Sequence, residues 1–319
     1  MNTKLVLIDG IPGTGKSSTA QYIHLNLLRG GIANKWHHEE ESGHPLFYPD
    51  ANIQVIDWEE GLKRFIKTWP AKWDNLYKMV AGEREVHIIT SYLLQDGARV
   101  LFNNMVPNQQ IMAFCRDLVG RISRLDPVFV FMHAPDVRKL MRRTFKARGE
   151  DWKEYFISFD QRTKYAQARE LTGERASVSL WHDFQQLCEQ LYEVLDMRKV
   201  RFEVLDDNWP EIHTRLENVL EFAQTAPPGV DESRKGFYPG DYHEIRDHGL
   251  KCRIWRDSEE YRADFLWPGL PLIPVGRDLF AIRSLPVLFR FKWEGVSARI
   301  EIKGPGFYDI TGKTLYKVS

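Results

Sequence analysis

The stretch that decides the fold is LVLIDGIPGTGKSSTAQYI, residues 5–23. Its central part, residues 10–17, fits the pattern G-x-x-x-x-G-K-[ST] at every fixed position. The apolar run before it predicts a short buried strand, and the spacing of Ala20, Ile23 and Leu27 predicts a helix after it. Such a turn lets backbone N–H groups surround an anion at a helix N-terminus. Residues 10–17, called the phosphate loop below, therefore predict a nucleoside triphosphate site.

The motif also predicts which residues contact the nucleotide. Lys16 is expected to reach the β- and γ-phosphates, and the Ser17 hydroxyl is expected to ligate Mg²⁺. Asp9, which directly precedes the loop, is a second candidate metal ligand. The expected nucleotide-binding residues are Gly10, Gly13, Thr14, Gly15, Lys16, Ser17 and Ser18.

Length and composition narrow the class of protein. The 319 residues suffice for two domains with separate cores. Lys plus Arg and Asp plus Glu are both 44, so no global positive field favours a nucleic-acid partner. The three cysteines (Cys115, Cys188 and Cys252) are far apart and show no metal-type spacing, as expected for a reduced, cytoplasmic protein. The apolar runs are too short to span a membrane.

Residues 1–224 alternate short apolar strands with amphipathic helices, which predicts an α/β domain with a parallel sheet covered on both faces. The composition changes at TAPPGVDESRKG, residues 225–236, which we interpret as a linker. Short alternating runs in residues 237–319 predict a small antiparallel β-barrel or sandwich domain. The expected strands of the first domain are 5–8, 34–39, 86–93, 127–134 and 200–206, and its later helices are 136–147, 151–171, 177–197 and 209–222.

A second functional signal follows the fourth strand, in APDVRKLMRRTFKARGE, residues 134–150. Arg142 and Arg143 lie on the expected helix, and Arg148 precedes a glycine just beyond it. Arginines on a mobile lid can neutralise the charge of a phosphoryl group in transfer while excluding water. The alternative is a solvated basic helix face. Residues 136–149 are called the lid below.

With these residues the chain resembles a phosphate-loop kinase of the thymidylate-kinase and nucleoside-kinase group, over roughly residues 1–224. The resemblance lies in the phosphate loop with Asp9, in the lid, and in FDQRTKYAQARE, residues 159–170. It implies a five-stranded parallel sheet with the loop strand at its centre, ATP as donor and Mg²⁺ as cofactor. It also implies lid arginines at Arg142, Arg143 and Arg148, and it places residues 205–212 beside the adenine. Residues 237–319 resemble small lipocalin-like barrel domains.

One departure from that group concerns the acceptor. Thymidylate kinases end the third strand in an Asp-Arg pair whose arginine holds the acceptor's phosphate, whereas this chain has Thr90-Ser91-Tyr92, with Arg99 eight residues further on. A phosphorylated acceptor is therefore less expected, and a small compound with a hydroxyl group becomes at least as good a candidate.

The acceptor is expected at the carboxyl ends of the strands, where KWHHEEESGHPLFY, residues 35–48, leaves the second strand. A carboxylate at this place can accept the proton of the attacking hydroxyl. The candidates are Glu39, Glu40 and Glu41, which are called the acidic loop below. For any one of these glutamates, a hydrated surface loop is the simpler interpretation. Several aromatic residues could either line a pocket for a flat acceptor or pack in the hydrophobic core. They are Trp58, Trp69, Trp73, Tyr77 and Tyr92.

The sequence therefore predicts an ATP-dependent kinase that transfers the γ-phosphate to a hydroxyl of a small molecule. The expected catalytic residues are Lys16, Glu39, Glu41, Arg142, Arg143 and Arg148. A nucleoside or nucleotide kinase is the alternative among enzymes, and a nucleotide-dependent regulatory or toxin-type protein is the alternative from another class. The carboxy-terminal domain is open to three roles: a structural cap, a homodimer surface or a wall of the substrate site.

Overall fold

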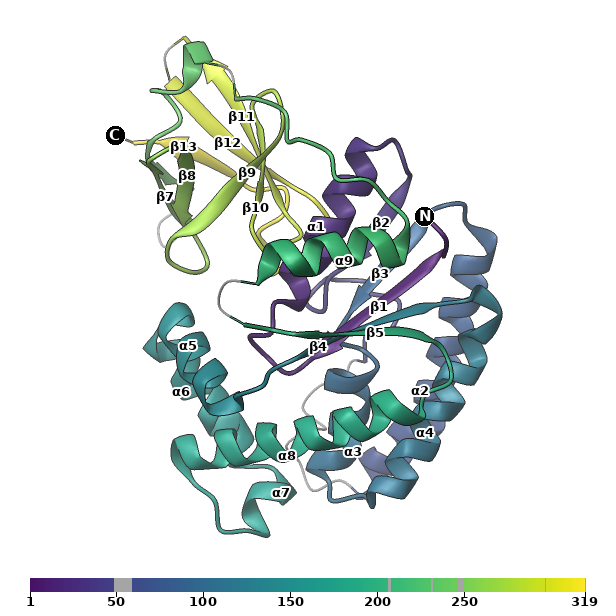
Figure 1. The fold of residues 1–319 in the computed structure, drawn as a ribbon. Coiled ribbons are helices and arrows are strands. Elements are labelled where there is room, and N and C mark those ends of the chain that lie inside the picture. The colour runs from purple at the N-terminus through teal and green to yellow at the C-terminus, as the bar shows by residue number, and fades with distance from the viewer. Residues whose placement is uncertain (49–58, 206–207, 231, 246–248, 296, 319) are drawn as a thin grey trace.

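The computed structural model describes residues 1–48, 59–205, 208–230, 232–245, 249–295 and 297–318. Figure 1 shows two parts, an α/β body below and a β-barrel above it, with helix α9 between the sheet and the barrel. The phosphate loop joins the first strand of the body to its first helix.

The body is built on a parallel sheet in the order β2-β3-β1-β4-β5, so the strand before the phosphate loop is central. This topology confirms the predicted five-stranded sheet. The burial of its three middle strands on both faces explains their almost uninterrupted apolar sequences. The strands are β1 (Leu5–Gly10), β2 (Asn34–His37), β3 (Val86–Thr90), β4 (Val128–His133) and β5 (Arg198–Glu203).

Helices cover both faces of the sheet, and β1 shows how the two cores are divided. Val6 and Ile8 pack with α1 (Lys16–Arg29) and α9 (Trp209–Leu220), whereas Leu5 and Leu7 belong to the opposite core. That alternation follows from the two-residue period of a strand. The opposite core is formed with α2 (Glu59–Gly82), α4 (Asn108–Ile122) and α8 (Gly173–Val194), which lie below the sheet in Figure 1.

Several elements differ from the sequence prediction. The helix expected over 151–171 is two helices, α6 (Glu150–Asp160) and α7 (Lys164–Gln167), which follow the lid helix α5 (Val137–Arg148). Thr163 causes the break, because its extended backbone and its side chain, which accepts a hydrogen bond from the Ala166 N–H, start α7. The π-helix η2 (Leu94–Ala98) and helix α3 (Arg99–Asn103) occupy a segment for which no element is predicted.

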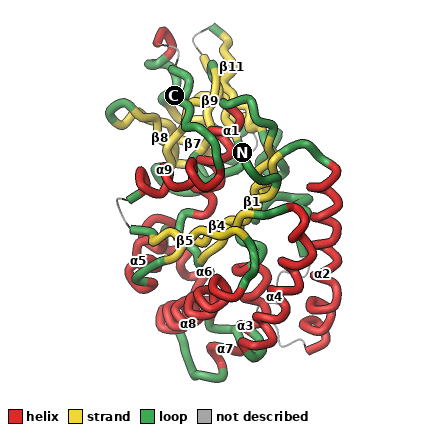
Figure 2. The backbone as a smooth tube through the Cα atoms, turned by 45° about the vertical axis from the view of Figure 1, so that its right-hand side comes forward, coloured by secondary structure: helices red, strands yellow, loops and turns green. Residues whose placement is uncertain are grey.

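The carboxy-terminal domain is a closed antiparallel barrel, which decides between the two predicted alternatives. Its strands run in the order β10-β11-β12-β13-β6-β7-β8-β9 around a core of alternating residues such as Phe289 and Phe291. Figure 2 shows these strands gathered at one end of the molecule. They are β6 (Gly240–His243), β7 (Lys251–Asp257), β8 (Glu260–Asp264), β9 (Leu270–Gly276), β10 (Leu279–Ile282), β11 (Leu288–Glu294), β12 (Ser297–Lys303) and β13 (Thr314–Lys317).

The barrel is docked on the body through specific hydrogen bonds. The buried Gln21 side chain of α1 donates to the carbonyl oxygens of Ile282 (2.8 Å) and Leu285 (3.1 Å) and accepts from the Ser284 N–H. A second contact joins the acidic loop to the barrel, where Glu41 forms an isolated β-bridge with Phe307. The barrel is therefore held next to both the phosphate loop and the acidic loop. None of the described helices is long and apolar enough to cross a membrane.

Candidate active site

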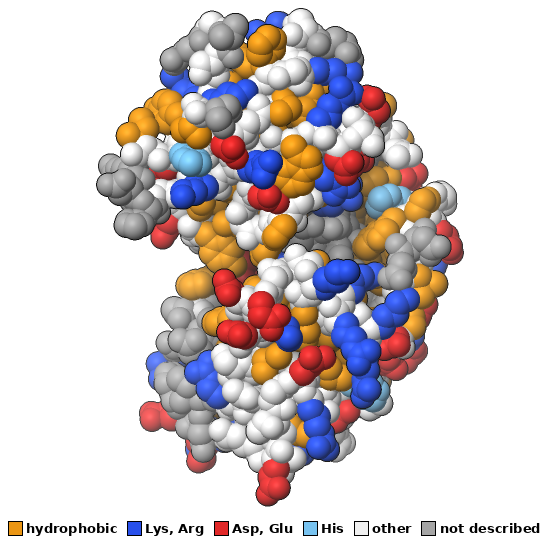
Figure 3. Space-filling model, turned by 90° about the vertical axis from the view of Figure 1, so that its left-hand side faces the viewer, with side chains coloured by type: hydrophobic (Ala, Val, Ile, Leu, Met, Phe, Trp, Pro, Cys, Tyr) orange, Lys and Arg blue, Asp and Glu red, His pale blue; other side chains and the backbone are white. Residues whose placement is uncertain are grey.

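A cavity of about 910 Å³ lies between the carboxyl ends of the strands, the lid and the barrel. Figure 3 shows the face on which the surface is indented between the barrel above and the helices below, with hydrophobic side chains along the indentation. The lining therefore comes from segments far apart in the sequence. Its charged and amide side chains are Lys16, Glu39, Glu40, Gln95, Asp96, Arg99, Arg143 and Arg148.

The phosphate loop turns tightly because its glycines have backbone angles and surroundings that exclude a side chain. Gly13 and Gly15 have φ values of 87° and 85°. A Cβ atom at Gly13 would lie 2.0 Å from Thr144 Oγ1, and one at Gly15 would lie 2.4 Å from the ring of Trp209. No described side chain caps the N-terminus of α1, which starts at Lys16. This geometry fits an anion held by backbone N–H groups at a helix N-terminus.

Gly13, Gly15, Lys16, Ser17 and Ser18 all line the cavity. Gly10 and Thr14 are buried in the floor of the loop, where the Thr14 hydroxyl donates to the carbonyl oxygen of Ile11. The Ser18 hydroxyl lies 2.6 Å from that of Ser284 in the barrel. The first turn of α1, directly after the loop, is therefore in contact with the barrel as well as with the cavity.

Lys16 and Glu39 are connected by Gln95, a residue that the sequence analysis missed. Lys16 Nζ donates to Gln95 Oε1 at 2.8 Å and to the carbonyl oxygen of Ile11 at 3.2 Å. Gln95 Nε2 lies 3.5 Å from Glu39 Oε2. The available signal was its position after the third strand, whose carboxyl end lies beside that of β1 in a parallel sheet.

Glu39 follows the end of β2 and faces the same cavity as Lys16. Burial raises the pKa of its carboxyl, but the charge of Lys16, together with His38, Ser91 and Arg148, outweighs that effect and holds the pKa below its usual value. Glu39 is therefore ionised at neutral pH. The Tyr92 hydroxyl donates to its backbone carbonyl at 3.1 Å, which fixes the start of the acidic loop.

Glu41, the other predicted base, does not line the cavity. Its carboxylate accepts a hydrogen bond from the His38 N–H at 3.3 Å and lies 3.9 Å from the His37 ring. The chain turns after β2, so that alternate residues of the acidic loop do not share one direction: Glu39 and Glu40 face the cavity, whereas the Glu41 carboxylate turns back to His37 and His38. Burial raises the pKa of Glu41 to about 7.

Asp9 is placed to organise the site and not to face it. Its carboxylate accepts four backbone hydrogen bonds, two at Oδ1 from Gly10 (2.9 Å) and Gln95 (3.2 Å), and two at Oδ2 from Leu93 (3.1 Å) and Leu94 (2.7 Å). Burial raises its pKa to about 6, against the opposite effects of Lys16 and of these hydrogen bonds. Asp9 therefore holds the start of η2, and with it Gln95, against the central strand. Both of its oxygens are engaged, which counts against the predicted contact with a metal.

The lid arginines divide into two groups. Arg143 and Arg148 line the cavity, whereas Arg142 is exposed and does not. The Arg148 guanidinium lies over two rings, 3.7 Å from the centroid of Trp267 in the barrel and 5.3 Å from that of Trp152 in α6. At about 100° per residue, the lining positions Arg143, Thr144, Ala147 and Arg148 lie on one face of α5, and Arg142 lies outside that face.

A buried ion pair after the third strand was also missed. Asp96 lies 3.8 Å from Arg99, and the guanidinium of Arg99 packs over the Trp181 ring at 4.8 Å. Burial, together with the nearby Glu39, raises the pKa of Asp96 to about 8, although Arg99 acts in the opposite direction. The pair brings a second carboxyl group into the part of the cavity that Glu39 faces.

The predicted aromatic residues are partly core and partly lining. Trp69 and Tyr92 line the cavity, whereas Trp73 is fully buried and Tyr77 packs against the core of the body. Trp58 lies outside the described residues. The wall is completed by aromatic residues that the prediction did not include, chiefly Phe47, Tyr48, Phe65, Trp152, Tyr155, Phe156, Phe159, Trp181, Trp267 and Tyr308.

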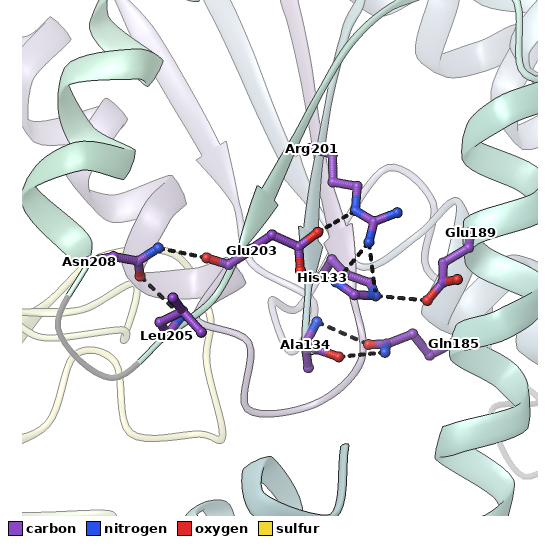
Figure 4. Close-up of polar contacts among 8 residues, drawn as sticks. All are labelled: His133, Ala134, Gln185, Glu189, Arg201, Glu203, Leu205 and Asn208. Carbon is purple, nitrogen blue, oxygen red and sulfur yellow. Dashed lines mark hydrogen bonds and ion pairs between the residues drawn. The ribbon is translucent and has the colours of Figure 1, made fainter. Parts of the chain in front are cut away.

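The end of the fourth strand carries a structural network, shown in Figure 4. His133 lies between the carboxylates of Glu203 (2.5 Å) and Glu189 (2.7 Å). Gln185 of α8 pairs with both backbone groups of Ala134, accepting from its N–H and donating to its carbonyl oxygen. Ala134, two residues before the lid, is thereby anchored to α8, which gives the lid a fixed base.

No family model matches the chain, and no curated protein matches it. Among solved structures, shikimate kinase from Acinetobacter baumannii in complex with shikimate is 15% identical and covers 69% of this chain and 94% of its own, with a TM-score of 0.38.

Two thymidylate kinases also match. The enzyme from Candida albicans is 15% identical and covers 69% of this chain and 91% of its own, with a TM-score of 0.40. The enzyme from Ehrlichia chaffeensis is 12% identical and covers 69% of this chain and all of its own (100%), with a TM-score of 0.37. In this chain the phosphate loop follows the central strand of a five-stranded parallel sheet, and a closed barrel is appended to that α/β body.

Proposed function

We propose that this protein is an ATP-dependent kinase that transfers the γ-phosphate to a hydroxyl group of a small molecule. One observation carries the proposal: the phosphate loop, the ionised Glu39 and two lid arginines line the same cavity. Phosphoryl transfer needs a phosphate-binding loop, cations around the transferred group and a carboxylate beside the acceptor hydroxyl. The phosphate loop, the lid arginines and Glu39 supply these three groups in one cavity.

The residues present fit ATP and Mg²⁺. The N–H groups of the loop and the Lys16 ammonium would hold the phosphates, and the Ser17 hydroxyl would hold the metal. Mg²⁺, when bound, neutralises charge on the phosphate oxygens. The structure gives Asp9 a different role, as the anchor of η2.

Glu39 is the carboxylate best placed to act on the acceptor. As the acceptor oxygen bonds to the γ-phosphorus, the bond from that phosphorus to the bridging oxygen breaks and ADP departs with the electron pair. The hydroxyl proton passes to Glu39, which is ionised and can hold it before releasing it to solvent. Arg143 and Arg148 lie close enough to the cavity to stabilise the charge on the equatorial oxygens.

A nucleoside kinase is the second candidate, and the aromatic wall favours it. Trp69 and Tyr92 both line the cavity, and their ring centroids lie 6.1 Å apart with a 16° interplanar angle. Such a surface suits stacking on a flat base. Both candidates are kinases with the same reacting groups, and they differ only in the acceptor.

The test is acceptor-dependent release of ADP across nucleosides, sugars, amino alcohols and antibiotics, with the product identified by mass. We expect one class to give a product heavier by one phosphoryl group, and we expect the Lys16→Ala variant to give none. Slow ATP hydrolysis that no acceptor stimulates, together with tight capture of a protein partner, would instead favour the regulatory class.

A further inference from the structure

The barrel forms part of the cavity wall, through Leu266, Trp267, Ser284 and Tyr308. Two of these side chains lie beside charged groups of the body: Trp267 lies over Arg148, and the charge of Glu40 acts on the Tyr308 hydroxyl. The Gln21 hydrogen bonds hold the loop that carries Ser284 against α1. The barrel is therefore placed to act on what the cavity binds.

One corner of the cavity already holds an organic cation, the guanidinium of Arg148. We call it the cation corner, and it consists of Glu39, Glu40, Trp152, Trp267 and Tyr308. The Trp267 ring lies 3.7 Å from the guanidinium carbon, and both glutamates act electrostatically on the same guanidinium. An aromatic face beside carboxylates is the usual surroundings of a bound ammonium or guanidinium group. Arg148 shows that a cation fits here.

The charges of the lining leave this corner electronegative once the nucleotide binds. The proposed function assigns Lys16, Arg143 and Arg148 to the phosphates. Among the described residues of the lining, Arg99 is then the cation opposite Glu39 and Glu40, and it already lies 3.8 Å from Asp96. Glu40 and the Trp267 face would lose their cation when Arg148 turns to the transferred phosphoryl group.

We propose that the acceptor carries an ammonium or guanidinium group besides its reactive hydroxyl, and that Glu40 and the Trp267 ring of the barrel bind this group. The inference rests on the proposed kinase function and gives its acceptor a chemical class. A cation there replaces Arg148 in the corner, so acceptor binding and the movement of Arg148 to the phosphates favour each other. The surrounding aromatic residues suit the hydrocarbon part of such a compound.

The test uses matched acceptors that differ only in charge, each hydroxyl-bearing amine beside its N-acetyl derivative. We expect the amine to be phosphorylated and its acetylated partner to show a much higher KM. Trp267→Leu and the isosteric Glu40→Gln should each raise KM for the amine by about tenfold, with KM for ATP unchanged. Trp255→Leu is the matched control, because Trp255 is half-buried in the same barrel but does not line the cavity.

The outcomes separate this inference from the kinase function. If neutral acceptors are phosphorylated as well as amines, or if Trp267→Leu and Glu40→Gln leave KM for the amine unchanged, the inference fails while the kinase function stands. If no hydroxyl compound of either charge is phosphorylated, the kinase function itself fails. Glu40→Gln keeps the size of the side chain and removes its charge. Its effect on KM for the amine therefore tests the inference even if Trp267→Leu disturbs the barrel.

Discussion

At the scale of residues, the site depends on how Gln95 lies between Lys16 and Glu39. Its side-chain oxygen accepts from Lys16 at 2.8 Å, and its nitrogen lies 3.5 Å from Glu39. The opposite charges of the two residues are thus kept apart by an uncharged amide, which leaves the Lys16 ammonium near the loop and the Glu39 carboxylate on the acceptor side. Lys16 is thus expected to act on the phosphates and Glu39 on the acceptor, and each role can be tested by substitution.

Lys16→Ala is expected to abolish phosphoryl transfer and leave the fold intact. The side chain makes two hydrogen bonds in the cavity, and it is absent from the hydrophobic cores. The measurements are product formation with the identified acceptor and the circular dichroism spectrum. A folded Lys16→Ala protein with full activity would remove the basis of the proposed function.

Glu39→Gln is expected to lower kcat by about a hundredfold or more, because it removes the proton acceptor while preserving size. Affinity for ATP should stay nearly unchanged. Glu41→Gln is the matched control, since Glu41 lies outside the cavity lining and should keep normal kcat. Loss of activity in the Glu41 variant alone would move the base to that residue.

The pH profile gives a second readout of Glu39. Burial raises its pKa, but Lys16, His38, Ser91 and Arg148 bring it below the usual value of a glutamate, and the ionised form is the active one. Activity should therefore stay level from neutral pH down and fall only as the pH passes below that lowered pKa. An acid limb of kcat/KM near pH 7 would point to a group with a raised pKa instead.

At the scale of elements, the segment after β3 is held by one buried carboxylate. Asp9 binds the N–H groups of Leu93, Leu94 and Gln95, so η2 starts at a fixed point beside the phosphate loop. Asp9→Asn would turn an amide nitrogen towards backbone donors. We expect it to lower the free energy of unfolding by about 2 kcal/mol, measured by urea denaturation, and to lower activity through Gln95. An unchanged midpoint would show that these bonds do not stabilise the fold.

The lid offers a comparison within one helix. Arg148→Ala is expected to lower kcat by about a hundredfold, as for the loss of a group that stabilises transition-state charge. Arg142→Ala should have little effect, because Arg142 is exposed and outside the cavity lining. Equal effects of the two substitutions on kcat would mean that the lid acts through its net charge alone.

The sequence predicted those parts of the site that local patterns encode. The phosphate loop has a fixed spacing, the strands have apolar runs, and Glu39 follows a strand whose carboxyl end must lie near the loop. Gln95, Asp96 and Trp267 were missed because their roles depend on contacts between distant segments: η2 with β1, and the barrel with the lid. The directions of Glu41 and Arg142 also depend on turn geometry that a run of like residues does not reveal.

At the scale of the whole molecule, the body and the barrel are joined twice, by the chain and by the surface that closes the cavity. The described residues 222–230 form neither helix nor strand and include the exposed Pro227. The docking surface, by contrast, is built from buried hydrogen bonds of Gln21 and the Ser18–Ser284 contact. The covalent connection is thus the more accessible of the two, and the docked surface is the one that the site requires.

Limited proteolysis of the full chain tests this difference. We expect cleavage within residues 225–236 to give a fragment of about 225 residues, as seen on a denaturing gel. Under native conditions this fragment should still bind ATP. In size-exclusion chromatography without denaturant, the two pieces should elute together and keep phosphorylating the acceptor, because the Gln21 hydrogen bonds persist after the chain is cut. Gln21→Ala, which removes those bonds, should let the pieces separate after the same cleavage and raise KM for the acceptor more than KM for ATP. Pieces that separate in the unsubstituted protein would show that the chain itself holds the barrel over the cavity. Full protection of residues 225–236 would show that this connection is not the accessible one.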